Sequence, residues 1–460
     1  MKTRFHIQAT LVAAGILCLP TAADWPGYGG DMARSRVADS SLQANLVESW
    51  RWSSPVPPRP AWPGPAKWDA YNKVHDMKSR LMFDAANHVA IGTEHVYIGS
   101  SGDDKVYALD RATGEVDWTF YTEGPIRFAP WLEGDRLLVG SDDGRIYCLD
   151  ARTGEATWSR RPAGADRRVP GNGRIISAWP VRTGPIVRDG IVYCTAGLFP
   201  LEGVHLCAYD LEDGDVLWSR RFEDLPAQGY LLASHDRLYV PTSRDAPVIF
   251  DRSDGTRIGR AGGQGGTWAL LTGDTLVYGP GKTGTIGVHE ATKGDQLATF
   301  AGNHMIVTPS MSYLHTDTEL VALDRAEYLR LAAERSAAAS RQQQISELLA
   351  AGNEDRAALE SEAMELGARI DSLVAAMQDC FKWRAPCGHP YSIVLAGDLV
   401  IAGGDDEVAA YDAIDGSLAW SEAVDGEAHG LAVDDGVLYV TTDRGALHCF
   451  EPAPVAGGTP

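Results

Sequence analysis

The stretch that decides the fold is Ala108-Leu109-Asp110-Arg111-Ala112-Thr113-Gly114-Glu115-Val116-Asp117-Trp118. It reduces to the pattern Ala-x-Asp-x-x-Thr-Gly-x-x-x-Trp. Later copies that keep the acid, the glycine and the tryptophan begin at Cys148, Ala208 and Ala410 and end at Trp158, Trp218 and Trp420. Copies without the tryptophan stand at Asp251 with Gly255 and at Glu290 with Gly294, and Asp324 and Glu451 keep only the acid. The chain therefore carries eight copies of one repeat.

Most acidic positions of the repeat follow one another at about 40 residues, the length of one four-stranded β-propeller blade. Two steps are longer. A 60-residue step contains a loop rich in Arg, Pro and Gly around residues 160–184. In an 88-residue step, the tryptophan expected eight positions after Asp324 comes 59 positions later, at Trp383. This shift predicts an insertion of 51 residues inside the sixth blade.

Each copy also has the local chemistry of a blade. Residues 96–99 and 106–109 are two β-rich runs separated by Gly and Asp, which predicts a hairpin. The Thr-Gly pair then turns the chain into a strand that contains the tryptophan. We expect the tryptophan rings to fill the gaps between neighbouring blades, where each ring N–H can reach a carbonyl.

The two ends of the repeat array complement each other. The last copy stops at Glu451 with no tryptophan after it, whereas Trp50 and Trp52 have no hairpin before them. The N-terminal strand is therefore predicted to complete the last blade, which closes the ring and removes exposed sheet edges.

The repeated pattern resembles the PQQ-type (pyrroloquinoline quinone) repeat of quinoprotein alcohol dehydrogenases and of outer-membrane assembly lipoproteins of the BamB type. The resemblance spans about Trp50 to Glu451. It implies an all-β, eight-bladed, quinoprotein-like β-propeller with an inserted α-helical hairpin. Residues 24–31 also resemble the start of exported bacterial PQQ-repeat proteins. Because the repeat residues are blade scaffolding, the resemblance leaves the function open.

Residues 1–23 read as a Sec signal peptide, with Lys2 and Arg4 before an apolar run and small residues at 21–23. A buried helix is the alternative, and a lipid anchor at Cys18 is disfavoured by the bulky Leu17 before it. We expect a periplasmic or extracellular protein, soluble or peripherally attached to the envelope. The other predicted segments are 24–88 with the closing strand, 89–324 and 380–452 as propeller, 325–379 as the insertion, and 453–460 as a tail.

The formal charge of −21 excludes nucleic acid as a partner, because phosphate backbones would be repelled. Acidic pairs such as Asp103-Asp104 and Asp142-Asp143 are read as solvated turns; Ca²⁺ sites are the alternative, but no twelve-residue calcium loop is present.

Six cysteines follow the signal peptide. Cys194 with Cys207 on one hairpin, and Cys380 with Cys387 around the return from the insertion, are the candidate disulfides in an oxidising compartment. Cys148 and Cys449 occupy the small-residue position of the repeat and are expected as buried free thiols.

The insertion is rich in Ala, Glu, Arg and Leu, contains no Pro, and is interrupted at Gly352-Asn353, which predicts two helices. Residues with the spacing of a narrow apolar seam are Leu329, Ala332, Ala333 and Ser336 on the first arm and Leu359, Ala363, Leu366, Ile370 and Leu373 on the second. An antiparallel coiled coil that docks another protein is one interpretation. A solvated spacer held only by its own seam is the other.

The residues that enter each innermost strand should ring the mouth of the central channel. They are aromatic and basic: Arg127, Arg174, Trp179, Arg182, Tyr230, Trp268, His304, His389, Tyr391 and His429, with Asp84 nearby. This set predicts a binding site for a small anionic or planar ligand. Alternatively, the same residues plug the channel and satisfy one another. The spacing of the histidines does not indicate a metal site.

Quinoprotein dehydrogenases hold the quinone against a disulfide of two adjacent cysteines, beside a calcium site. This chain has no Cys-Cys pair and no recognisable calcium trio. The sequence therefore favours an exported, non-catalytic binding or scaffold module of the cell envelope, without a cofactor. The alternative is a PQQ-dependent oxidoreductase that uses Ca²⁺.

Overall fold

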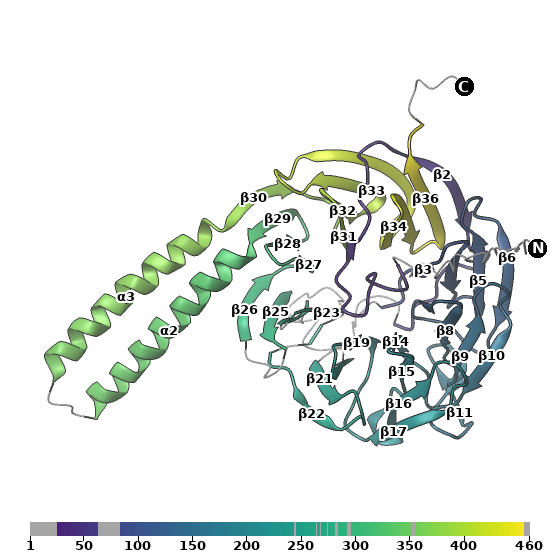
Figure 1. The fold of residues 1–460 in the computed structure, drawn as a ribbon, viewed down its shortest axis with the longest axis horizontal. Coiled ribbons are helices and arrows are strands. Elements are labelled where there is room, and N and C mark those ends of the chain that lie inside the picture. Colours follow the sequence, from purple (N-terminus) through teal and green to yellow (C-terminus); the bar gives the residue numbers. More distant parts are fainter. Residues whose placement is uncertain are drawn as a thin grey trace, which may run out of the picture.

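The structure is a computed structural model that describes residues 25–62, 83–242, 245–263, 265–266, 268–273, 275–280, 284–291, 296–351 and 355–454. The predicted signal peptide, Gly294 and residues 455–460 of the predicted tail lie outside the described residues. Within the described part, the chain is all-β apart from two long helices and one 3-10 turn at Pro200–Glu202. Figure 1 shows the sheets arranged around a common centre, with the helices projecting from one side.

Six four-stranded antiparallel sheets follow one another along the chain. Their strands are β3 (Val89–Ile91), β4 (His95–Gly99), β5 (Lys105–Asp110) and β6 (Val116–Tyr121); β7 (Trp131–Glu133), β8 (Arg136–Gly140), β9 (Ile146–Asp150) and β10 (Ala156–Arg160); β14 (Ile186–Arg188), β15 (Ile191–Ala196), β16 (Val204–Asp210) and β17 (Val216–Phe222); β19 (Leu232–Ala233), β20 (Arg237–Thr242), β21 (Asp245–Asp251) and β22 (Arg257–Arg260); β23 (Trp268–Thr272), β24 (Thr275–Gly279), β25 (Thr285–Glu290) and β26 (Gln296–Ala301); and β27 (His304–Val307), β28 (Met311–His315), β29 (Glu319–Asp324) and β30 (Phe381–Pro386).

A further sheet contains eight strands in the order β1-β31-β32-β33-β34-β35-β36-β2. Their bounds are β1 (Val37–Ala38), β31 (Ser392–Ala396), β32 (Leu399–Gly403), β33 (Asp405–Asp412), β34 (Leu418–Asp434), β35 (Val437–Thr442), β36 (Ala446–Pro452) and β2 (Leu46–Ser53). The long repeat step contains the hairpin of β11 (Arg168–Gly171) and β12 (Arg174–Ser177), and β13 (Thr183–Gly184) pairs with β18 (Gly229–Tyr230).

The repeat residues form a turn. At the end of β5, Asp110 Oδ1 accepts hydrogen bonds from the Thr113 N–H and hydroxyl, both at 2.8 Å, while the Gly114 N–H donates to the Asp110 carbonyl at 2.9 Å. Gly114 has φ +71°, which favours glycine. The chain then enters β6 and reaches Trp118. The repeated pattern therefore encodes the tight turn that connects the third strand of a sheet to the fourth.

Repeat tryptophans join their sheets to the next ones, as predicted. The Trp118 Nε1–H donates to the Ala151 carbonyl at 3.2 Å, and Trp158 donates to the Leu211 carbonyl at 2.8 Å. The ring covers the glycine of the next turn, because a Cβ on Gly154 would lie 2.5 Å from the Trp118 ring. We call this pairing the tryptophan lock. Further locks join Trp50 to Arg111 and Gly114, and Trp383 to Ala413 and Gly416.

The N-terminal strand β2 pairs with the last strand β36, so the predicted pairing is confirmed. The register is antiparallel and sets Val47 opposite Glu451 and Trp50 opposite Cys449. β2 is also locked on both sides, because Trp420 donates to the Leu46 carbonyl at 3.0 Å and Trp50 donates to the Arg111 carbonyl at 3.0 Å.

The insertion is a helical hairpin between β29 and β30, made of α2 (Arg325–Ala350) and α3 (Arg356–Gln378). Asp324 makes no tight turn here. Its carboxylate accepts the Glu327 N–H at 3.1 Å and caps α2. Arg341 binds both carboxylate oxygens of Glu362 at 2.7 and 2.9 Å, which sets the two helices side by side.

The apolar seam of the hairpin was predicted correctly on one arm only. On α3, Leu359 and Leu373 are buried, and Ala363, Leu366 and Ile370 are half-buried. On α2 the buried positions are Leu331, Ala332, Ala338 and Ile345, so the predicted Ala333 and Ser336 are wrong because both are exposed. The base of the hairpin also joins the core of the neighbouring sheets: Leu331, Leu373 and Met377 pack with Phe300 and Leu314.

The first prediction tests the tryptophan lock. Gly154→Ala adds a methyl group against Trp118 at a residue with φ +73°, whereas Gly190→Ala adds one at φ +71° with nothing within 4 Å. Both changes cost roughly 1–2 kcal/mol of backbone strain. The clash should cost Gly154→Ala a further ~1–3 kcal/mol in urea unfolding. Equal losses for the two variants would show that the ring contact contributes nothing.

The second prediction separates the shaft of the hairpin from its base. Replacing residues 341–362 by a short Gly/Ser link removes the shaft and should change the free energy of unfolding by less than about 1 kcal/mol, because loop length costs little. Replacing residues 327–378 also removes Leu331, Leu373 and Met377 from the core and should cost more than ~2 kcal/mol. Calorimetric melting of both variants measures this, and equal stability would contradict the packing of the base.

Candidate functional site

The N-terminal segment of residues 25–38 lies at the centre of the molecule and bonds to five sheets. The backbone N–H groups of the inner strands donate to its carbonyls. The bonds are Ile91 to Trp25 (2.9 Å), Leu132 to Pro26 (2.8 Å), Ala233 to Met32 (3.3 Å), Leu271 to Ala33 (2.8 Å) and Leu395 to Arg36 (2.9 Å). Because these acceptors belong to one short segment, the segment ties the inner ends of the sheets together. We call it the central segment.

Side chains of the central segment stack with rings from the sheets. The Tyr28 ring lies on Tyr230 with centroids 3.8 Å apart and planes 8° apart. The Arg34 guanidinium lies over Tyr230 at 5.3 Å, and Arg36 lies over Trp268 at 5.7 Å. Such cation–π contacts are strengthened when the groups are desolvated. Trp268 in turn stacks on His304 with centroids 5.9 Å apart.

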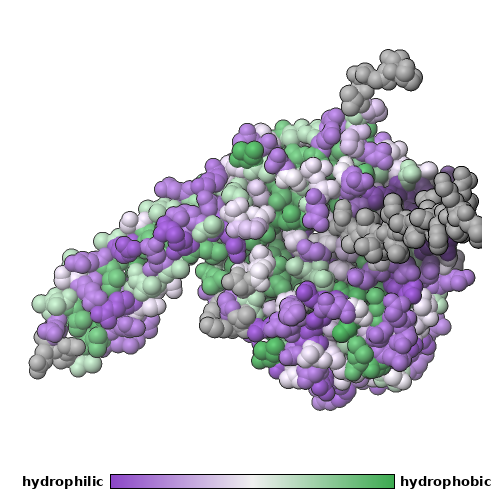
Figure 2. All heavy atoms as spheres, viewed as in Figure 1, coloured by the Kyte–Doolittle hydropathy of each residue, from purple (hydrophilic) through white to green (hydrophobic). Residues whose placement is uncertain are grey.

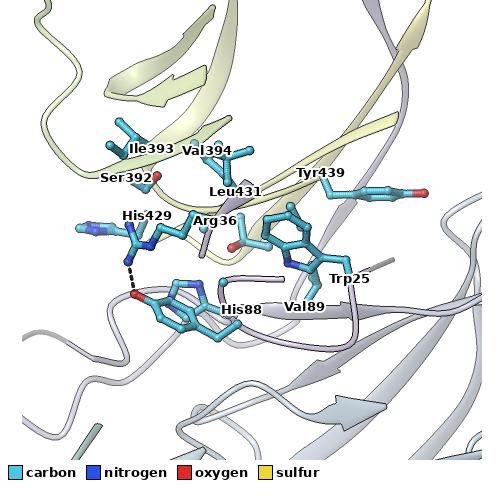
Figure 3. Close-up of a pocket in the computed structure, with 15 residues that line it drawn as sticks. Trp25, Arg36, His88, Val89, Ser392, Ile393, Val394, His429, Leu431 and Tyr439 are labelled. Carbon is cyan, nitrogen blue, oxygen red and sulfur yellow. Dashed lines mark hydrogen bonds between the residues drawn. The ribbon is translucent and has the colours of Figure 1, made fainter. Parts of the chain in front are cut away.

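A central cavity of about 50 Å³ remains between these groups. It is lined by Tyr28, Arg36, Phe83, Ala85, His88, Tyr230, Trp268, His304, Tyr391 and His429. A second cavity of about 20 Å³ lies beside it (Figure 3), where Arg36 approaches the rings of His429 and His88 and donates a hydrogen bond to the Tyr28 hydroxyl. At roughly 10–15 Å³ for each water molecule, the two spaces hold a few waters.

Burial controls the charges around the cavity. It lowers the pKa of His88 to about 3, and the neighbouring His429 and Arg36 act in the same direction, so His88 is neutral at pH 7. Burial also lowers the pKa of Arg34 to about 10, which leaves its guanidinium charged. His429 Nε2 lies 2.9 Å from Glu427 Oε2. The arrangement therefore presents the Arg36 guanidinium and the neutral His88 ring to a small space.

Arg127 and Arg182 belong to a separate, buried ion network. Asp142 accepts from Arg127 Nε at 2.7 Å and from Arg182 Nε and Nη2 at 2.6 and 2.8 Å, while Arg127 Nη1 reaches Asp84 at 2.7 Å. Burial raises the pKa of the Asp142 carboxyl, but the charges and hydrogen bonds of Arg182 and Arg127 outweigh this and lower it below its usual range. Two arginines and two aspartates compensate one another here, so this network is structural.

The structure therefore divides the predicted mouth set. Tyr230, Trp268, His304, Tyr391 and His429 line the central cavity. The other five do not line it: Arg127 and Arg182 are in the ion network, Arg174 pairs with Asp104, Trp179 donates to the Glu202 carbonyl at 2.9 Å, and His389 contacts Tyr411 and Glu407. Sequence reasoning missed Tyr28, Arg36 and His88. The only signal for Tyr28 was the resemblance of residues 24–31 to related N-termini.

The candidate disulfides are not formed in the structure, where all six described cysteines are buried free thiols. Cys194 lies opposite Cys207 in the β15–β16 ladder, but the Cys207 thiol contacts Ser219 Oγ at 3.3 Å. Cys380 and Cys387 lie at opposite ends of the extended strand β30 and cannot meet. The free thiols predicted at Cys148 and Cys449 are confirmed. Among the described residues, no group of three His, Cys, Asp or Glu side chains is placed to hold a metal ion.

The third prediction concerns the ion network. Asp142→Asn leaves Arg127 and Arg182 buried without their shared carboxylate and should cost about 3–5 kcal/mol of stability. Because the folded pKa of Asp142 is lowered, its stabilisation is full above the unfolded pKa near 4 and is lost as the pH falls. Stability measured between about pH 7 and pH 3 should therefore fall less in Asp142→Asn. The matched change at the exposed Asp135, which pairs with Arg136 at 3.4 Å, should leave stability and pH profile unchanged. A pH profile of Asp142→Asn parallel to the wild type would contradict the assignment.

Comparisons with known proteins agree with this architecture. No curated protein sequence matches the chain. The structure is similar to the quinohemoprotein alcohol dehydrogenase from Comamonas testosteroni, with a TM-score of 0.60 at 14% identity over 95% of this chain and 82% of that one. A europium-containing methanol dehydrogenase gives a TM-score of 0.57 at 11% identity over 93% and 98%, and the computationally designed Ika8 protein gives 0.56 at 14% over 80% and 96%.

At these identities the similarity shows the fold alone.

Among the described residues, no helix has the length and apolar character that a membrane span requires. A family model described as outer membrane protein assembly factor BamB matches residues 64–179, 102–327 and 381–454, which is more than half of the chain. The chain therefore belongs to this family of PQQ-repeat β-propeller proteins.

Proposed function

We propose that the protein is an exported, non-catalytic β-propeller of eight blades that acts as a binding or scaffold module in the cell envelope. In this proposal the eight-stranded sheet counts as two blades. β34, which is 17 residues long, serves as the outer strand of one blade and the inner strand of the next. β2 then completes the last blade and closes the ring. The family description, an outer membrane protein assembly factor, supports the envelope location.

One observation carries the proposal: the chain fills its own centre. The Trp268 ring, the candidate floor for a planar ligand, already stacks on His304 and lies under Arg36. The cavity of about 50 Å³ is too small for a tricyclic quinone. The residues around it do not fit that cofactor in the described arrangement, which supports a role that does not depend on it. The space and the Arg36 charge suit a small anion better than a planar ring system.

The helical hairpin is the surface that we propose for a protein partner. α2 and α3 project away from the ring of sheets (Figure 1), so a partner could bind the shaft without touching the blades. Met364 is 77% exposed and Leu348 is 38% exposed. Figure 2 shows such apolar patches between the charged residues of the shaft. Isolated apolar side chains on a charged helical arm are compatible with reversible docking.

The fourth prediction tests the scaffold role in cells. Loss of the protein should lower the amount of integral proteins in the outer membrane, and the full chain should restore it. A variant in which a Gly/Ser link replaces residues 341–364, which removes the shaft together with Met364, should be exported and folded yet fail to restore the amount. A matched control that removes an exposed apolar residue elsewhere, Ile414→Ser, should restore it fully; Ile414 is 75% exposed on a propeller turn. Full rescue by the shaft variant would refute the docking role.

The enzyme alternative is tested on the same purified protein. With PQQ and Ca²⁺ added, we expect neither dye-linked alcohol oxidation nor a thermal shift. A ligand at 100 times its Kd would stabilise the fold by about 2.7 kcal/mol and would be seen. Turnover together with a shift that Trp268→Ala abolishes would overturn the non-catalytic proposal.

A further inference from the structure

A cysteine, a histidine and a glutamate form a connected cluster away from the central cavity. Cys387 follows β30, and its backbone N–H donates to the Thr318 carbonyl at 2.8 Å. Its Sγ lies 3.8 Å from His389 Nδ1. His389 Nε2 lies 3.1 Å from Glu407 Oε2 on β33. A thiol next to an imidazole that a carboxylate orients is the arrangement of an activated nucleophile.

The carboxylate determines which imidazole nitrogen can act as a base. Because Glu407 accepts a hydrogen bond, it holds a proton on His389 Nε2 and leaves Nδ1 unprotonated, so that Nδ1 can take the proton of Cys387. Gly404 fixes the position of the ring, since a Cβ on this residue would lie 2.5 Å from His389 Cδ2. The cluster therefore depends on a glycine that leaves room for this ring.

Two further groups surround the sulfur. The Tyr411 hydroxyl lies 3.0 Å from His389 Nδ1 and contacts the thiol. His315 on β28 is fully buried, and both of its ring nitrogens lack a hydrogen-bond partner among the described residues. Burial alone would raise the pKa of the thiol, but the neighbouring His315 and His389 side chains outweigh it and lower the pKa of Cys387. The contact with Cys387, together with Glu407, raises the pKa of His389.

The other thiols have no such surroundings. Cys148 and Cys449 occupy alanine-like positions in the sheets, where burial raises the pKa of each to about 12. Cys387 is itself 2% exposed, but the next residue, Gly388, is exposed. The thiol therefore lies just beneath the surface, so we expect small reagents to reach it and large ones to be excluded. Cys380, beyond the far end of β30, cannot form a disulfide with it.

We propose that Cys387 is a nucleophilic thiolate, paired with the His389 imidazolium, and that it is the site at which small hydroperoxides oxidise this protein to a sulfenic acid. In this step the sulfur attacks one peroxide oxygen, so that an S–O bond forms and the O–O bond breaks. The sulfur loses two electrons and the peroxide gains them. The departing alkoxide, or hydroxide in the case of hydrogen peroxide, takes the proton from His389 Nδ1 and leaves as the alcohol or as water. Tyr411 and His315 then donate hydrogen bonds to the oxidised group.

The fifth prediction compares the alkylation rates of individual cysteines in the folded, mature protein. Iodoacetamide is added between about pH 5 and pH 9, and each cysteine is followed by peptide mass spectrometry. At pH 6.5 Cys387 should react at least about tenfold faster than Cys148 or Cys449, because the thiolate is the reactive form. Hydrogen peroxide with a sulfenic-acid trap should label the same residue.

Variants show whether the reactivity of Cys387 comes from His389 and Glu407 or from solvent exposure alone. His389→Ala and Glu407→Gln should move the pH midpoint of Cys387 alkylation upwards. At pH 5, below the pKa of about 6, a rise of one pKa unit should slow the reaction by about tenfold. Gly404→Ala should act in the same direction by displacing the ring. The matched control is Asp117→Asn, which breaks a similar pair, at 2.9 Å from His95, in a sheet position without sulfur. It should leave the profile of Cys387 unchanged.

Two results would overturn the proposal. One is a Cys387 rate no faster than that of Cys148, or seen only above the urea midpoint, which would mean that the thiol is an inert core residue. The other is an unshifted pH profile in folded Glu407→Gln. Because the labelling needs neither a partner nor PQQ, its outcome is independent of the scaffold function.

Discussion

The tryptophan lock is the interaction on which the rest of the structure depends. A four-stranded sheet cannot bury both of its faces alone, so it needs a neighbour at a fixed angle. The lock provides this through a ring N–H bonded to a carbonyl of the next turn and a ring face packed on that turn's glycine. Where the tryptophan is missing, as after Glu290, other contacts replace it. Phe300 packs there with the base of the helical hairpin.

The central segment adds a second constraint, which acts on several sheets together. The locks join neighbouring sheets in sequence, whereas the carbonyls of Trp25 to Arg36 bond to inner strands of five sheets at once. The segment then continues through β1 into β2, which pairs with the last strand. One stretch of chain therefore holds the centre and completes the sheet between first and last repeats. Because the segment fills the centre, only enough space for a few water molecules remains. The residues that stabilise the arrangement of the sheets therefore occupy the volume that a cofactor would need.

The sequence predicts those parts of the molecule that depend on local chemistry. The Asp-x-x-Thr-Gly turn is decided within five residues, so its copies and their sheets could be located from spacing alone. The seam of α3 could be found because Leu359 and Leu373 stand among polar residues. The seam of α2 could not be found, because this helix contains many alanines, so that apolar residues occur at seam spacing on several of its faces. Tyr28, Arg36 and His88 have no counterparts in the repeat, and their meeting at the centre depends on long-range pairing that no spacing reveals.

The repeats also show why chemistry is confined to a few positions. Pairs of histidine and carboxylate recur in several sheets: His95 with Asp117, His429 with Glu427, and His448 with Glu48. The first pair links β4 to β6 in one sheet, the second lies within β34, and the third links β36 to β2. His389 and Glu407 form the same kind of pair, but Cys387, directly after β30, puts a sulfur beside His389 Nδ1. A histidine that would otherwise only stabilise the scaffold can thus act as a base, because a cysteine lies next to it. New reactivity on a repeated fold arises where one copy departs from the others while the geometry of the sheet stays the same.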